Sequence, residues 1–191
     1  MQPKYYGAAA EYNKSRNIGL GQIIKIIGLI IGLIIFITIG YFVFTALTSG
    51  GKDSAATLVA RERVVLSFLT TNQATIENDT LKTITSNAAS LLSSDHYSLT
   101  QGMKAAYGLV APPEEINKAE ADTTSKKTLD TAKVQSRFDV VYMELLREKL
   151  ASAQQLARTV QGQSNGVLKT AADTTIKNIT TIDEQLAKLQ L

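Results

Sequence analysis

Residues 26–48, IIGLIIGLIIFITIGYFVFTALT, form an apolar run of 23 residues without a charged side chain. As an α-helix rising about 1.5 Å per residue, the run would be roughly 34 Å long, which is enough to cross a hydrocarbon core of about 30 Å. A helix buried in a soluble core would be shorter and would have a polar face. The run therefore predicts one transmembrane helix at 26–48.

The charges on either side of this run predict its orientation. Residues 1–25 contain four basic residues and one acidic residue, whereas residues 51–191 contain 16 of each. Because positive residues favour the cytoplasmic side, we expect a basic cytoplasmic tail at 1–25, a linker at 49–54 and an extracytoplasmic domain at 55–191. The predicted location is the cell membrane, with a single pass and with the lipid bilayer as a partner.

A cleaved signal peptide is the alternative interpretation of the same run. Its apolar region would span only about 7–15 residues and would be followed by a small-x-small cleavage site. Within the run, Gly28 and Gly32 form a G-x-x-x-G, and Gly40, eight residues further on, continues this register, which lets two membrane helices pack closely. Glycine is also common in membrane helices generally, so this spacing is not specific.

Composition excludes several classes of function for the outer part of the chain. The chain has no cysteine, which excludes disulfides, thiolate metal sites and cysteine nucleophiles. With equal numbers of acidic and basic residues, 51–191 lacks the basic stripe that nucleic-acid binding requires. We therefore expect no nucleic-acid partner.

The hydrophobic pattern of residues 55–191 is helical almost throughout, and strand signals are nearly absent. Asn78 or Asp79 offers an N-cap for a second helix, and Gly108 with the following prolines stops it. Residues 114–136 are polar, with one short helix expected around 123–132. Two long amphipathic helices are expected before the polar stretch, one from Ala55 to about Leu69 and one that ends at Gly108. Two more are expected after it, one from Phe138 and a closing one to Leu189.

These four amphipathic helices, with short turns and one longer crossover, predict an all-α fold, an up-and-down four-helix bundle. About 135 residues suffice for a single core, so no second domain is needed.

Little in this domain is suited to catalysis. A di-iron bundle uses Glu-x-x-His motifs on two helices, and the chain has none and a single histidine, His96. Asp95 and His96 are sequence neighbours, so on a helix they point about 100° apart and would chelate one ion poorly. A Ser-His-Asp triad is formally possible, but there is no nucleophile elbow. We expect no enzyme activity, no cofactor and a half-buried or surface role for His96.

Two segments resemble a known family. These are LLSSDHYSLTQGMKAAYGLVAPP at 91–113, with its Asp95-His96 pair, and FDVVYMELLREKLASAQQL at 138–156, with Phe138, Asp139 and Tyr142. They resemble the bacterial extracytoplasmic family catalogued as domain of unknown function 4142, and the likeness covers roughly 57–190. The resemblance implies a ferritin-like four-helix bundle in the bacterial cell envelope, and it implies no activity.

The chain departs from this family where relatives usually carry further histidines, since Leu150 and Gln185 stand there. We therefore expect a membrane-anchored envelope protein that acts by contact with a partner protein, cell-wall material or itself. The alternative is a stress or sensor module that binds a metal or small ligand through His96 with Glu62 or Glu77. Asp139 and Tyr142 are expected to fix the start of their helix and the crossover.

Overall fold

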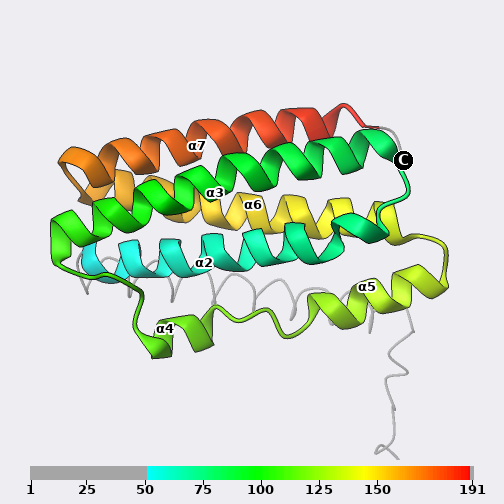
Figure 1. Cartoon of the computed structure of the whole chain (residues 1–191), viewed down its shortest axis with the longest axis horizontal. Helices are drawn as coiled ribbons and strands as arrows, with labels where there is room; N and C mark the ends of the chain where they lie inside the picture. The colour runs from blue at the N-terminus through cyan, green and yellow to red at the C-terminus, as the bar shows by residue number, and fades with distance from the viewer. Residues whose placement is uncertain (1–50, 190–191) are drawn as a thin grey trace, which may run out of the picture. The chain divides into compact units, whose positions relative to one another are not determined.

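The computed structural model describes residues 51–189, and all the secondary structure in this range is helical (Figure 1). The all-α prediction is thus confirmed for this part of the chain. The elements are α2 (Gly51–Asn72), the 3-10 turn η1 (Gln73–Thr75), α3 (Asp79–Tyr107), α4 (Glu114–Ala119), α5 (Ser125–Val134), α6 (Phe138–Gln163) and α7 (Gly166–Ala187).

The four long helices form a bundle in which α2 and α7 each lie beside α3 and α6 (Figure 1). Asp139, in the first turn of α6, accepts hydrogen bonds from the backbone N–H groups of Glu77 and Asn78, just before α3. The helices α3 and α6 therefore begin at the same end and run in the same direction, because the crossover carries the chain back along the bundle. Neighbouring helices are antiparallel, but the order along the chain is up, down, down, up rather than the strict alternation of an up-and-down bundle.

Local signals define both ends of α3. Asn78 is its N-cap, and the Asn78 Oδ1 atom accepts a hydrogen bond of 2.9 Å from the backbone N–H of Leu81. At the other end Gly108 has a φ of 70°, and its N–H donates to the Lys104 carbonyl. This left-handed conformation suits glycine and closes the helix. Both predicted boundaries are confirmed.

Two predicted segments differ from the structure. Residues 51–54, expected in a linker, form the first turn of α2 because this turn packs closely against the end of α3. A Cβ atom at Gly51 would lie 2.4 Å from the Tyr107 hydroxyl, and Ser54 is buried. The crossover contains two helices, α4 and α5, where a single one was expected, since the short α4 has no periodic apolar pattern to reveal it.

The core divides into two apolar halves. The aromatic half contains Phe68, Tyr142, several leucines and isoleucines, and Leu129 from the crossover. The alanine half contains Leu58, Val59, Leu99, Met103, Val160, Leu168 and five alanines, Ala55, Ala56, Ala157, Ala171 and Ala172. Along α2, α3 and α7, buried polar residues separate the two halves.

The predicted tail at 1–25 and transmembrane helix at 26–48, with Gly28, Gly32 and Gly40, lie outside the described residues. Within 51–189, no helix is both long and apolar enough to cross a bilayer.

Candidate functional site

Five polar side chains meet between the two halves of the core, and we call them the polar layer. Glu62 comes from α2, Asp95 and His96 from α3, and Thr175 and Asn178 from α7. Glu62 and Thr175 are fully buried, and Asp95 is 2% exposed. Because buried carboxylates are rare unless they are paired, this layer is the first place to look for a function in the described domain.

Glu62 is the most enclosed of these groups. Its Oε1 atom accepts a long hydrogen bond of 3.4 Å from the Thr175 hydroxyl. Its Oε2 atom makes no hydrogen bond and lies 3.9 Å from Nδ1 of His96, which is also without a hydrogen bond. Burial raises the pKa of Glu62 well above its ordinary value, the negative charge of Asp95 raises it further, and the bond from Thr175 opposes them.

Asp95 faces α7 rather than His96. Both of its carboxylate oxygens accept hydrogen bonds from Nδ2 of Asn178, at 2.9 and 3.0 Å. Burial raises the pKa of Asp95, and the bonds from Asn178 partly offset this increase. The prediction that Asp95 and His96 point in different directions agrees with these partners, since one side chain meets α7 and the other meets α2.

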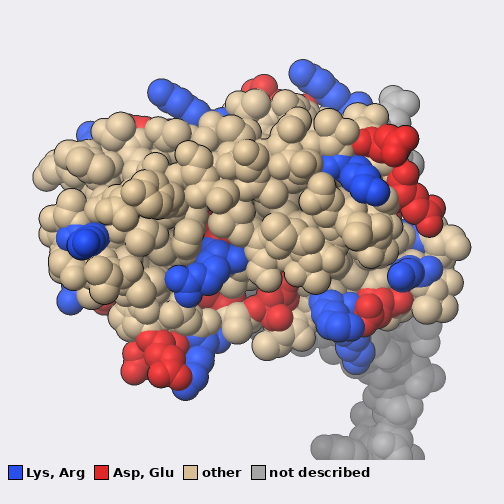
Figure 2. Space-filling view, in the orientation of Figure 1, with Lys and Arg blue, Asp and Glu red and all other residues tan. Residues whose placement is uncertain are grey.

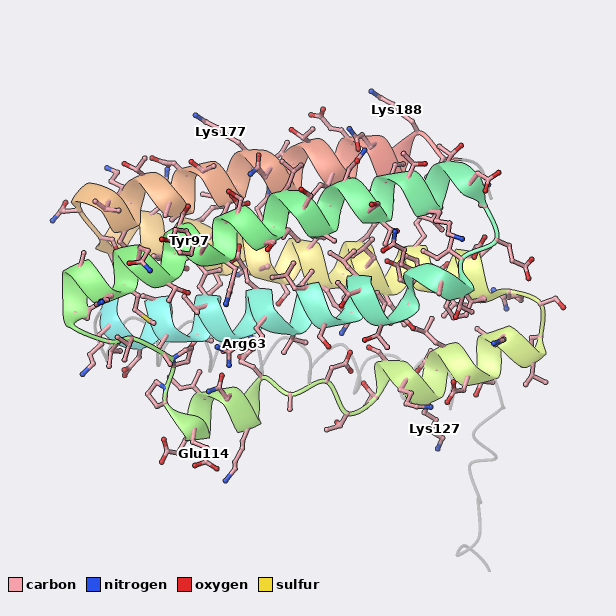
Figure 3. The ribbon with its side chains drawn as sticks, in the orientation of Figure 1. Arg63, Tyr97, Glu114, Lys127, Lys177 and Lys188 are labelled. Carbon is pink, nitrogen blue, oxygen red and sulfur yellow. The ribbon has the colours of Figure 1, made fainter. Side chains whose placement is uncertain are left out.

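The His96 side chain is 23% exposed, which matches the expectation of a half-buried helix residue. Burial lowers the pKa of His96, and the positive charge of Arg63, labelled on α2 in Figure 3, lowers it further. The imidazole is therefore held towards its neutral form, in which Nδ1 either donates or accepts one hydrogen bond.

Glu62 and His96 can exchange a proton or hold a ligand together only after a small movement of their side chains. At 3.9 Å, the Glu62 and His96 atoms are too far apart for a hydrogen bond. A tetrahedral Zn²⁺ bound at about 2.0–2.2 Å to each atom would need them at roughly 3.4 Å. Among the described residues, no group of three or more His, Cys, Asp or Glu side chains could hold a metal ion. The structure thus provides two converging atoms rather than a complete set of ligands.

The two carboxylates proposed beside His96 lie in different places. Glu62 faces His96, as predicted. Glu77 is exposed in the loop before α3 and, through its backbone N–H, bonds Asp139. Because His96 lies 17 residues beyond the start of α3, about 26 Å along the helix, Glu77 does not belong to the polar layer.

The residues of α6 on which the predicted resemblance rests make structural contacts. The Asp139 carboxylate accepts N–H bonds of 3.2 and 2.7 Å from Glu77 and Asn78, so it links the first turn of α6 to the start of α3. Tyr142 is fully buried, and its hydroxyl donates to Thr85 at 3.2 Å. Tyr142 also stacks between Phe68 and Phe138, with ring centroids 5.1 and 6.0 Å away.

Sequence reasoning missed the contribution of α7 to the polar layer. Thr175 falls on the buried face of α7, where the pattern alone groups it with the apolar residues. Asn178 lies beside that face, and only its partner Asp95 gives it a role. A usable signal exists, because Glu62, Asp95 and Thr175 are polar residues at buried positions of three helices.

Comparisons of the chain with protein-family models, with curated proteins and with solved structures gave no match. The resemblance to domain of unknown function 4142 therefore remains a prediction that rests on residues 91–113 and 138–156.

Proposed function

We propose that this protein is a single-pass envelope protein that displays a helical bundle outside the cytoplasm and acts by contact rather than by catalysis. The membrane part of the proposal rests on the uncharged run at 26–48 and on the excess of positive charge before it. The ferritin-like part is supported by four long helices with one long crossover, which is the connectivity of that class of bundle.

The outer side of α3 is the observation that favours a contact function. Between Lys82 and Lys104, every exposed residue of α3 is uncharged. Figure 2 shows the corresponding face of the molecule with few charged side chains. We call this surface the α3 strip, and its exposed residues are Thr83, Ser86, Asn87, Ser90, Leu91, Ser93, Ser94, Tyr97 and Gln101.

The composition of the α3 strip is typical of protein-binding surfaces. The centres of interfaces are depleted in charge and enriched in tyrosine, and tyrosine with serine and asparagine dominates antibody-combining sites. Tyr97, labelled in Figure 3, is 67% exposed and stands towards the C-terminal end of the strip. The partner is an envelope protein, cell-wall material or a second copy of the chain.

The topology can be tested by labelling cysteines, since the natural chain has none. Ala9→Cys and Ser136→Cys variants of the full chain are expressed in a bacterial host and treated with a membrane-impermeant maleimide. We expect labelling of position 136 in intact cells and of position 9 only after lysis. The reverse pattern, or recovery of the chain in the soluble fraction, would contradict the membrane part of the proposal.

The contact can be tested by crosslinking in intact cells, followed by purification in detergent. We expect crosslinked species that Tyr97→Arg removes, because a charge placed in an uncharged interface opposes its burial. Thr128→Arg is the matched control, since it adds the same charge at an exposed position of α5 in the crossover. A chain that stays monomeric and without a partner under several conditions contradicts the contact function.

The approach of Glu62 to His96 favours a second candidate, a sensor of a metal or small ligand. Elemental analysis of the full chain purified in detergent separates the two functions. A sensor would hold close to one transition-metal ion per chain and lose it in both His96→Ala and Glu62→Gln. A contact protein would show no metal that depends on these two residues.

A further inference from the structure

The two ends of the bundle differ in polarity. We call one of them the Gly51 end, because Gly51, Tyr107 and Gln163 come together there. Its two connections are residues 108–113, between α3 and α4, and residues 164–165, between α6 and α7. Neither connection contains a charged side chain, and neither do the helix residues 162–163 and 166–167 beside the second one. An exposed valine lies at each connection, since Val110 is 68% exposed and Val167, in the first turn of α7, is 61% exposed.

Lysines surround these loops. Lys52, Lys104 and Lys169 are exposed within one or two turns of the Gly51 end, where Asp53 is the nearest exposed acid on the long helices. Glu114 and Glu115 begin α4 after the loop, on the crossover side, where Figure 3 labels Glu114. Lys118 pairs with Glu114 at 2.8 Å. The Gly51 end thus combines two exposed valines with a rim in which Lys52, Lys104 and Lys169 stand beside the acids Asp53 and Glu115, since Lys118 neutralises Glu114.

The opposite end, where α2 leads into α3 and the crossover leads into α6, has a different surface. Its connections carry the exposed charges Glu77 and Arg137, and Asp79 and Lys82 follow in the first turn of α3. Val134 is exposed there by 87%, but it stands alone between Lys133 and Gln135. Only the Gly51 end therefore has uncharged loops in both of its connections.

The sequence before α2 indicates what covers the Gly51 end. The apolar run ends at Thr48 and α2 begins at Gly51, so only Ser49 and Gly50 lie between them. At no more than about 3.6 Å per residue, this connection holds Gly51 within roughly 11 Å of the end of the run. If 26–48 spans a bilayer, the Gly51 end is the part of the bundle nearest to the lipid headgroups.

We infer that the Gly51 end is a membrane-contact surface, on which Val110 and Val167 meet the interfacial layer and the lysines of the rim face the lipid phosphates. This inference rests on the proposed membrane anchor and adds an orientation to it. Exposed apolar side chains with lysines beside them are the chemistry that binds the surface of an anionic bilayer. The bundle then stands on the membrane by this end, and the α3 strip runs along its side.

The test places a fluorophore at three exposed valines of the full chain. Val110→Cys, Val167→Cys and the matched control Val134→Cys are labelled with an environment-sensitive dye. Each protein is reconstituted into vesicles of phosphatidylethanolamine and phosphatidylglycerol, with and without a lipid that carries a nitroxide quencher near the headgroup. Circular dichroism checks that each labelled variant keeps its helices, and vesicle flotation shows whether the chain is anchored.

We expect blue-shifted emission and quenching at positions 110 and 167, and neither effect at position 134. If the chain floats with the vesicles but positions 110 and 167 are not quenched, the contact surface is wrong while the anchor stands. Quenching at all three positions would mean that the bundle lies flat and would overturn the orientation. If the chain does not float at all, the proposed anchor fails, and the membrane-contact surface fails with it.

Discussion

The two halves of the bundle core are filled in opposite ways. In the aromatic half, Tyr142 is packed between Phe68 and Phe138, and large side chains occupy the space between the helices. In the alanine half, small side chains let the helices approach closely. A Cβ atom on Gly102 of α3 would lie only 2.8 Å from the Cα atom of Leu168 on α7.

This difference predicts how each half fails. A region filled by large side chains is sensitive to their truncation, because a cavity remains. A region of close helix contact is sensitive to enlargement, because the backbones have no space to give. Between the halves, the polar layer is sensitive to charge rather than to size, since Glu62 and Asp95 are buried carboxylates.

The largest effect is expected in the aromatic half. Tyr142→Ala removes a fully buried ring and its stacking partners, and it should lower the free energy of unfolding by about 3–5 kcal/mol. Chemical unfolding of the full chain in detergent, followed by far-UV circular dichroism, measures the change.

Tyr97→Ala is the control for this substitution, because Tyr97 is 67% exposed on the same bundle and its loss should change stability by no more than about 0.5 kcal/mol. The loss of stability in Tyr142→Phe should lie between these two values. This substitution keeps the ring, at a cost of about 1 kcal/mol for the hydrogen bond to Thr85. Equal losses of unfolding free energy in Tyr142→Ala and Tyr97→Ala would refute the assignment of Tyr142 as the centre of the aromatic half.

In the alanine half, adding a single methyl group should destabilise the protein. Gly102→Ala places a Cβ atom against the backbone of α7, and overpacking of this kind costs about 1–3 kcal/mol. Gly162→Ala is the matched control, because a Cβ atom there meets nothing within 4 Å. Alanine is the better helix former, so the control should raise stability by about 0.5–1 kcal/mol. If both substitutions are stabilising, the close approach of α3 and α7 is wrong.

Much of this architecture follows from the sequence, since the helix boundaries at Asn78 and Gly108 have direct local causes in a capping side chain and a left-handed glycine. The opposite packing of the two halves is harder to foresee, because the separation between helices depends on which residues face one another. The role of Asp139 was missed for the same reason. Its partners Glu77 and Asn78 lie more than sixty residues away along the chain.

For the candidate site, the sequence offers both Glu62 and Glu77 as partners of His96. The position of Glu62 on the apolar face of its helix is the one signal in its favour, and only the packing of α2 against α3 brings it to His96. The contribution of Asn178 could not be predicted, because it requires the register between α3 and α7.

A change of charge without a change of size tests the polar layer. Burial raises the pKa of Glu62 in the folded state above its value of 4.5 in the unfolded chain. The protonated carboxyl therefore contributes its full share of the folding free energy below pH 4.5, and this share is lost as the pH rises through the folded-state pKa. The pKa of Asp95 is also raised by burial, so its contribution to stability is likewise lost as the pH rises. His96, whose pKa is lowered by burial and by Arg63, loses its contribution as the pH falls.

Glu62→Gln keeps the shape of the side chain and removes its charge. We expect this variant to match the natural chain near pH 4 and to exceed its stability at pH 8 by on the order of 1 kcal/mol, because ionisation of the buried carboxyl costs stability as the pH rises and glutamine has no charge to bury. Unfolding midpoints measured across this pH range provide the test. Glu148→Gln, at an exposed position of α6, is the control and should leave the pH profile unchanged. A Glu62→Gln variant that is less stable at pH 8 would show that the charged form supports the fold.

The smallest effect concerns the crossover, whose Leu129 completes the aromatic half from outside the four-helix ring. Asp122 accepts bonds from the backbone N–H groups of Thr124 and Ser125 at the start of α5, and Lys149 of α6 pairs with it at 2.8 Å. Burial alone would raise the pKa of Asp122, but the bonds from Lys149 and Ser125 outweigh it and lower the pKa below its ordinary value of 3.8. The carboxylate therefore stabilises the crossover above that value and loses this contribution as the pH falls.

Asp122→Asn should loosen α5 by about 0.5–1 kcal/mol, since the pair is partly exposed and one capping acceptor remains. Hydrogen exchange of the full chain should then speed up at residues 125–134, while the amides around Tyr142 stay protected. Asp130→Asn is the control, because Asp130 pairs with Lys126 within α5 itself and its loss leaves the contact with α6 intact. If exchange rises equally around Tyr142, then the crossover is an integral part of the aromatic half, and the two regions unfold as one unit rather than separately.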